Sequence, residues 1–130
     1  MINKLLIVGC GLIGSSILKK VCKKRIAKKI LVFEKSQKNQ KALKRFKLKF
    51  EIIKRIDKKI SACDFIIICT PLSEYRKIFL ACNKYSKKNV LITDVGSAKR
   101  NTITKINRIK RKDINWISSH PIADLKYLDH

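Results

Sequence analysis

Three glycines near the N-terminus have the spacing of a phosphate-binding turn. They form the pattern Gly-x-Gly-x-x-Gly, directly after the apolar run Lys4–Val8 and at the start of the amphipathic segment Leu12–Lys24. In such a turn the first glycine permits a sharp bend, the second lets a pyrophosphate approach the backbone, and the third lets the helix pack closely on the strand. Free amide groups at the positive end of the helix then hold the phosphate charge. The residues expected to form this site are Gly9, Gly11, Leu12, Ile13 and Gly14. The alternative is a tight strand–helix turn that binds nothing.

An acidic residue supplies the second part of this pattern. Glu34 follows the apolar run Ile30–Phe33 and stands twenty residues after Gly14. A carboxylate there can accept hydrogen bonds from both ribose hydroxyls of an adenosine, and it repels a 2′-phosphate. The pattern therefore favours NAD as the cofactor. NADP stays open as an alternative, because Lys35 and Ser36 follow immediately and can weaken the bias toward NAD. The simpler interpretation of Glu34 is a solvated residue at the end of a strand.

Polar residues also follow three later apolar runs, at Thr70-Pro71, in the segment Asp94–Lys99, and at His120-Pro121. A neutral imidazole such as His120 can accept a proton near neutral pH. Ser97 stands where a helix begins, so it can cap that helix or donate to a ligand. Asp94 and Lys99 can instead form a local polar pair, and a histidine before a proline can be purely structural.

The elements that must position these residues alternate between strands and helices. The predicted strands are Lys4–Val8, Ile30–Phe33, Phe50–Ile53, Phe65–Cys69, Val90–Thr93 and Ile114–Ser118. The predicted helical segments are Leu12–Lys24, Gln37–Phe46, Ile56–Ala62, Leu72–Tyr85 and a segment that ends near Ile109. Because the strands are apolar on both faces, we expect an α/β fold of Rossmann type. It is a doubly wound, mostly parallel sheet with helices on both faces and ligands at the carboxyl ends of the strands.

Length and charge limit the remaining classes of protein. The chain has 130 residues with 32 Lys+Arg against 9 Asp+Glu, a formal net charge of +23. The basic residues are mostly lysine, occur along the whole chain, and are not interleaved with aromatic residues, so we expect no specific nucleic-acid partner. The apolar runs are far shorter than the roughly 20 residues that span a bilayer, so we expect no membrane partner.

The cysteines and histidines do not form a metal-binding pattern. The five cysteines are Cys10, Cys22, Cys63, Cys69 and Cys82. No two have zinc-knuckle spacing, and the chain has only two histidines. Scattered cysteines without a secretory signal are typical of free thiols in a reducing cytoplasm. We therefore expect a cytoplasmic protein with no metal and no disulfide.

Four segments together resemble the prephenate and arogenate dehydrogenase family. They are GCGLIGSS at 9–16, CTP at 69–71, TDVGSAK at 93–99 and HPIA at 120–123. The resemblance covers residues 1–123 and only the family's nucleotide-binding domain. It implies a small-molecule substrate, prephenate or arogenate, that is oxidatively decarboxylated with NAD in tyrosine biosynthesis.

The same resemblance implies roles for individual residues. His120 matches the histidine that binds the substrate's 4-hydroxyl and helps to deprotonate it, and Ser97 matches a serine near the nicotinamide and the substrate. Thr70 and Pro71 would line the cofactor's ribose and nicotinamide, and Gly96 belongs to the same cofactor-binding set.

The sequence departs from the family pattern after Ala123. Residues 124–130 replace the glycine-rich acidic stretch of the family, and we expect them to be a divergent tail. The family's helical domain, which binds the substrate carboxylates and forms a homodimer, is expected to be absent. This predicts a truncated dehydrogenase that binds nucleotide. The alternatives are a stand-alone, non-catalytic dinucleotide-binding module and, third, a basic RNA-associated protein.

Overall fold

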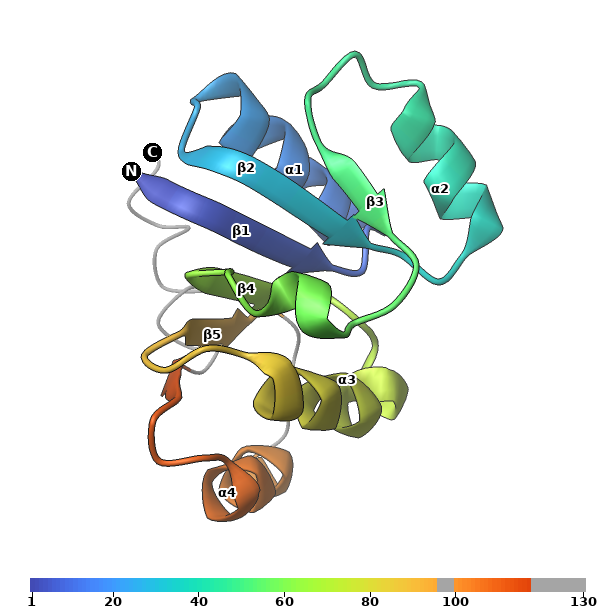
Figure 1. Cartoon of the computed structure of the whole chain (residues 1–130). Coiled ribbons are helices and arrows are strands. Elements are labelled where there is room, and N and C mark those ends of the chain that lie inside the picture. The colour runs from blue at the N-terminus through green and yellow to red at the C-terminus, as the bar shows by residue number, and fades with distance from the viewer. Residues whose placement is uncertain (96–99, 118–130) are drawn as a thin grey trace, which may run out of the picture.

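The fold is built on one parallel β-sheet in a computed structural model that describes residues 1–95 and 100–117. Six strands pair in the order β3-β2-β1-β4-β5-β6 (Figure 1). The strands are β1 (Ile2–Val8), β2 (Ala27–Phe33), β3 (Glu51–Ile53), β4 (Phe65–Ile68), β5 (Leu91–Asp94) and β6 (Asn115–Ile117). Every pairing in this sheet is parallel, which confirms the predicted Rossmann-type class.

Helices connect successive strands and cover both faces of the sheet. They are α1 (Leu12–Lys23), α2 (Gln37–Lys44), the short 3₁₀ helix η1 (Lys58–Ile60), α3 (Leu72–Tyr85) and α4 (Arg100–Ile109). The side chains of β1 alternate between the two faces: Leu5 and Ile7 pack in one core with α1 and α2, whereas Leu6 and Val8 pack in the other with α3 and α4. Both sets are almost completely buried, so the continuous apolar runs of the strands are explained by a sheet covered on each side.

The order of the strands places a ligand site at the end of the sheet where the strands have their carboxyl ends, called the carboxyl edge below. The chain runs from β1 outward through β2 to β3, and then returns to place β4 on the other side of β1. The connections after β1 and β4 therefore diverge to opposite faces. In open α/β sheets a crevice forms at this switch point, outside the carboxyl ends of the strands.

Several boundaries differ from the sequence expectation. β1 and β2 begin earlier than predicted because Ile2 pairs with Ala27, so hydrogen bonding continues beyond the apolar residues. The predicted helix Ile56–Ala62 is instead the single 3₁₀ turn η1, whose start is capped by the Asp57 carboxylate accepting from the Lys59 N–H at 3.0 Å. Helix α2 ends at Lys44, before Phe46.

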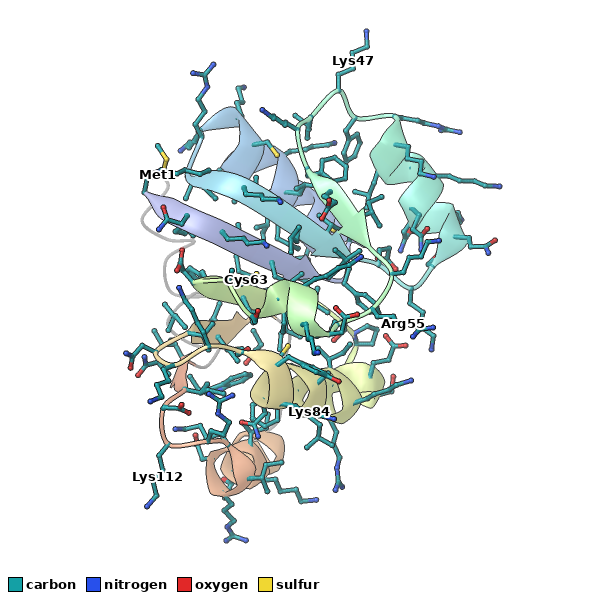
Figure 2. The ribbon with its side chains drawn as sticks, viewed as in Figure 1. Met1, Lys47, Arg55, Cys63, Lys84 and Lys112 are labelled. Atoms are coloured by element: carbon teal, nitrogen blue, oxygen red, sulfur yellow. The ribbon has the colours of Figure 1, made fainter. Side chains whose placement is uncertain are left out.

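Basic side chains point outward in different directions over the molecule (Figure 2). Lys47, Arg55 and Lys112 lie at separate edges, Lys84 lies over α3, and all four come from different parts of the chain. Within the described residues, no helix is long and apolar enough to cross a membrane.

Candidate dinucleotide-binding site

A cavity of about 980 Å³ lies at the carboxyl edge of the sheet. Its walls come from the turn between β1 and α1, the end of β2 with the start of α2, and the connection from β4 to α3. Among its lining residues are six of those predicted from the sequence, Gly9, Gly11, Ile13, Glu34, Thr70 and Pro71. The fold thus brings together residues that are more than sixty positions apart in the sequence, at the switch point.

The glycine turn has the backbone geometry that its sequence predicts. Gly9 has a φ of +89°, a left-handed conformation that side chains rarely adopt. A Cβ on Gly14 would lie 1.9 Å from the Gly9 carbonyl oxygen, so α1 packs directly on the turn. A Cβ on Gly11 would meet no atom within 4 Å, so this residue faces open space beside the cavity. These features fit a pyrophosphate that approaches the Gly11 backbone.

The start of α1 leaves amide groups available for an anion. Gly11 is the N-cap and provides no side chain to cap the helix, and the first turn contains no acidic residue. The hydroxyls of Ser15 and Ser16 donate to the carbonyls of Gly11 and Leu12, and thus do not satisfy these amides. Leu12 itself is exposed and is not part of the cavity wall. Unpaired amides at the positive end of a helix are a general anion-binding arrangement.

Glu34 lies beside this turn with its carboxylate held in one orientation. Its side chain is 8% exposed. Oε1 accepts from the Cys10 backbone N–H at 2.6 Å and from Asn39 Nδ2 at 3.3 Å, and Oε2 accepts from the Ser36 N–H at 2.8 Å. A carboxylate has about four acceptor positions, so one position on Oε2 remains for a hydroxyl in the cavity. Glu34 is therefore not a freely solvated strand end.

The donors to Glu34 were not identified from the sequence. Cys10 lies inside the glycine pattern, and Asn39 lies in the first turn of α2, where Ser36 caps the helix by accepting from the Asn39 N–H at 3.3 Å. Gln40 adds a bond from its Nε2 to the Glu34 carbonyl oxygen at 2.6 Å. Ser36, a residue type favoured at helix N-caps, was the available sequence evidence that α2 begins next to the carboxylate.

The wall opposite Glu34 is formed by the end of β4 and the start of α3. The Cγ2 atom of Thr70 lies 3.0 Å from the position that an added Cβ atom on Gly9 would occupy, so Thr70 packs against the glycine turn. Its Oγ1 is buried and forms no hydrogen bond within the described part of the chain. Pro71 is the N-cap of α3. Both residues lie where the sequence prediction placed them, in the cavity wall.

A tyrosine and an aspartate beside this wall were not singled out as a pair by the sequence. Tyr75 on α3 lines the cavity and is 2% exposed, and Asp94 at the end of β5 is fully buried. Burial and the nearby Asp94 carboxylate raise the pKa of the Tyr75 hydroxyl, so it stays protonated. The Tyr75 ring packs edge-on against Trp116 with ring centroids 5.9 Å apart. This arrangement supports the wall where β4, β5 and β6 end.

The cysteines near the cavity are neutral thiols. Burial raises the pKa values of Cys10 and Cys69 to about 12. None of the five cysteines forms a disulfide. In residues 1–95 and 100–117, no group of three or more His, Cys, Asp or Glu side chains could hold a metal ion. Three predicted site residues, Gly96, Ser97 and His120, lie outside the described residues.

Together, the sheet order, the glycine turn and the oriented carboxylate define a dinucleotide-binding domain of dehydrogenase type. Residues 17–125 match the family model of the prephenate dehydrogenase nucleotide-binding domain. The chain belongs to this family, which confirms the resemblance found in the sequence. The matched segment begins just after the glycine turn and includes Glu34, Thr70 and His120.

Individual relatives agree with this assignment. The chain is 30% identical over 125 residues to a prephenate dehydrogenase of Lactococcus lactis subsp. cremoris (strain MG1363), covering 93% of this chain and 34% of that protein. It therefore spans about a third of the length of this curated relative.

Two solved structures share the fold. Prephenate dehydrogenase from A. aeolicus, in complex with hydroxyphenyl propionate and NAD⁺, aligns with a TM-score of 0.73 and 24% identity over 88% of this chain and 40% of that chain. Synechocystis arogenate dehydrogenase aligns with a TM-score of 0.65 and 22% identity over 81% of this chain and 37% of that chain.

Proposed function

We propose that this domain binds NAD at the carboxyl edge of its sheet and serves the oxidative decarboxylation of prephenate or arogenate in tyrosine biosynthesis. The observation that carries the proposal is the oriented Glu34 carboxylate beside the open backbone of Gly11, both in the wall of one cavity. Family membership supplies the reaction class. The relative that was solved with NAD⁺ and a hydroxyphenyl ligand supports the choice of cofactor and substrate.

The residues present fit the parts of NAD. The amides of the β1–α1 turn and the start of α1 would hold the pyrophosphate, and Glu34 would accept from a ribose hydroxyl. Thr70, Pro71 and Gly96 would line the nicotinamide side of the site. The chemistry supplied by bound NAD is the acceptance of a hydride from the substrate carbon that carries the hydroxyl.

Two further residues would act on the substrate. His120 would accept the proton of the 4-hydroxyl as that carbon becomes a carbonyl, since a neutral imidazole is a competent base near neutral pH. Loss of carbon dioxide then sends its bonding electron pair into the ring, and the proton returns to the phenolate oxygen of the aromatic product. Ser97 would orient the substrate hydroxyl and nicotinamide by hydrogen bonding.

Titration of NAD and NADP onto the purified chain tests the binding half of this proposal. We expect NAD to bind more tightly than NADP, because Glu34 disfavours a 2′-phosphate. If neither dinucleotide binds at millimolar concentration, the assignment of the site is wrong.

The catalytic half is tested by NADH formation at 340 nm with prephenate and with arogenate. The assay uses this chain or a longer protein that contains it. His120→Asn is expected to lower the turnover rate at least about tenfold, because general acid–base catalysis contributes typically about 10²–10⁴-fold, while the Kd for NAD stays the same. An unchanged rate removes His120 from the mechanism. Binding of NAD without turnover of either substrate favours the alternative of a non-catalytic dinucleotide-binding module.

A further inference from the structure

An ion pair joins two walls of the nucleotide cavity. Lys35 directly follows Glu34 at the end of β2, and its Nζ lies 3.1 Å from Oε1 of Glu74 in the first turn of α3. Both residues line the cavity. The pair therefore connects the β2 side of the site to the α3 side, across the opening between them.

The charged groups of the cavity differ from those of the rest of the chain. The described residues that line it include two carboxylates, Glu34 and Glu74, and one ammonium, Lys35. The whole chain has only 9 acidic residues against 32 Lys+Arg. A protein with a net charge of +23 attracts anionic ligands of every kind through its overall field. The overall field does not favour NAD over the more negatively charged NADP, so a preference for NAD depends on local groups such as these three.

We propose that Glu74 determines the cofactor preference of this site by holding the Lys35 ammonium away from the 2′ position of the adenosine ribose. The inference rests on the proposed function, because it assumes that Glu34 binds a ribose hydroxyl. A basic side chain next to this acidic position is the group that accommodates a 2′-phosphate in NADP-binding sites. Lys35 occupies that sequence position, and its partner Glu74 neutralises it.

The burial of the two partners supports this assignment of roles. The Lys35 side chain is 74% exposed, whereas that of Glu74 is 34% exposed. The lysine can therefore change its position, and the glutamate on α3 is the more fixed partner. An ion pair this exposed contributes little to folding stability, because water and salt screen it. Removing the Glu74 charge should leave the fold intact and free the Lys35 ammonium to pair with a 2′-phosphate in the cavity.

The test is isothermal titration of NAD and NADP onto the full chain and three variants, Glu74→Gln, Lys35→Gln and the double variant. We expect Glu74→Gln to lower the Kd for NADP relative to the Kd for NAD by about three- to fivefold, the upper range for an exposed ion pair. The gain should disappear in the double variant, because the group that binds the 2′-phosphate is then missing. It should also shrink as salt is raised from 50 to 300 mM.

Glu51→Gln is the matched control. Glu51 is an exposed carboxylate at the start of β3, outside the cavity wall. Its replacement removes the same charge from the overall field, so the ratio of the two Kd values should not change. An unchanged ratio in Glu74→Gln overturns the inference. A gain that persists without Lys35, or that Glu51→Gln reproduces, also overturns it, because the effect then comes from net charge. If the unmodified chain binds neither dinucleotide, the proposed function fails first and this inference with it.

Discussion

Two carboxylates at opposite ends of the sheet form similar hydrogen bonds in different surroundings. Glu34 follows the carboxyl end of β2 and accepts from the backbone N–H groups of Cys10 and Ser36. Asp64 precedes the amino end of β4, and its Oδ2 accepts from the backbone N–H groups of Asn3 at 2.9 Å and Lys4 at 3.1 Å. Each carboxylate also accepts from one side-chain nitrogen, Asn39 Nδ2 for Glu34 and Lys87 Nζ for Asp64.

The two carboxylates differ in what surrounds them. Glu34 lines the cavity at the edge where helices begin, next to free amides of α1. Asp64 lies at the edge where helices end, and it connects the start of β1 to the start of β4 and to Lys87. A carboxylate bonded to backbone amides is therefore not by itself a ligand site. The position of Glu34 at the carboxyl ends of a parallel sheet, beside a cavity, is what supports its proposed ribose-binding role.

The largest expected effect comes from the glycine turn next to Glu34. Gly14→Ala places a Cβ 1.9 Å from the Gly9 carbonyl oxygen, so α1 must shift away from the turn. We expect a loss of about 2–3 kcal/mol in the free energy of unfolding and loss of NAD binding. Urea unfolding followed by NAD titration measures both quantities.

Gly11→Ala is the matched control for this change. The added Cβ meets no atom within 4 Å, so the fold should lose at most about 1 kcal/mol, the cost of alanine at a helix N-cap. NAD affinity should still fall at least about tenfold, because the methyl group occupies the space through which a phosphate approaches the backbone. Normal NAD affinity in Gly11→Ala would mean that the turn is structural only.

The next largest effect separates the two carboxylates directly. Glu34→Gln removes the charge that is proposed to accept from a ribose hydroxyl, so the Kd for NAD should rise by at least about tenfold, in line with roughly 1.5–3 kcal/mol for hydrogen bonds to charged groups. Asp64→Asn should leave the Kd for NAD unchanged and lower the melting temperature. Calorimetric titration and thermal unfolding of both variants check this crossed pattern. If the two substitutions changed NAD affinity equally, Glu34 at the carboxyl ends of the strands would have no more part in NAD binding than Asp64 at the amino ends.

Local sequence patterns predicted the parts of this site that depend on backbone conformation. The glycine spacing predicted the turn at Gly9 and the close packing at Gly14, and the apolar runs predicted a parallel sheet. These features follow from steric limits on single residues and from alternating burial, both of which are visible in one sequence. The acidic residue at the end of β2 followed from its distance to the glycines.

Contacts between distant segments could not be predicted in the same way. The pairing of Lys35 with Glu74, and the position of Tyr75 next to Asp94, depend on how α3 lies across the end of β4. Tyr75 belongs to an apolar stripe on α3 with Ile78 and Phe79, so its pattern indicates only a core residue. Pairing between β1 and β2 likewise extends both strands into polar residues, where the pattern of apolar residues does not predict a strand.

A smaller effect concerns two half-buried thiols at opposite edges of the sheet. Cys69 lines the cavity, whereas Cys22 lies near the end of α1 with its Sγ 4.0 Å from the Lys49 carbonyl oxygen. Burial raises the pKa of both thiols, that of Cys69 to about 12. Because only the thiolate reacts, alkylation by iodoacetamide should be slow at pH 7 and accelerate steadily as the pH is raised. Bound NAD should slow the labelling of Cys69 severalfold without changing that of Cys22, as measured by mass spectrometry. Equal protection of both would mean that NAD acts through overall stability.

The smallest expected effect is the pH dependence of the structural carboxylate. The pKa of Asp64 lies below its ordinary value of 3.8. The main cause is the hydrogen bond that its carboxylate accepts from the Lys87 ammonium, and the second is the hydrogen bond from the Lys4 backbone N–H. A carboxyl whose pKa is lower in the folded chain contributes stability above its unfolded pKa, and that contribution is lost as the pH falls through the folded value. The difference in urea midpoint between the unmodified chain and Asp64→Asn should therefore be constant from pH 7 to pH 5 and shrink toward pH 3. A difference that persists at pH 3 would show that Asp64 acts through its shape and neutral hydrogen bonds. The contrast with Glu34 would then depend on the cavity alone, and charge at the amino edge of the sheet would have no part in it.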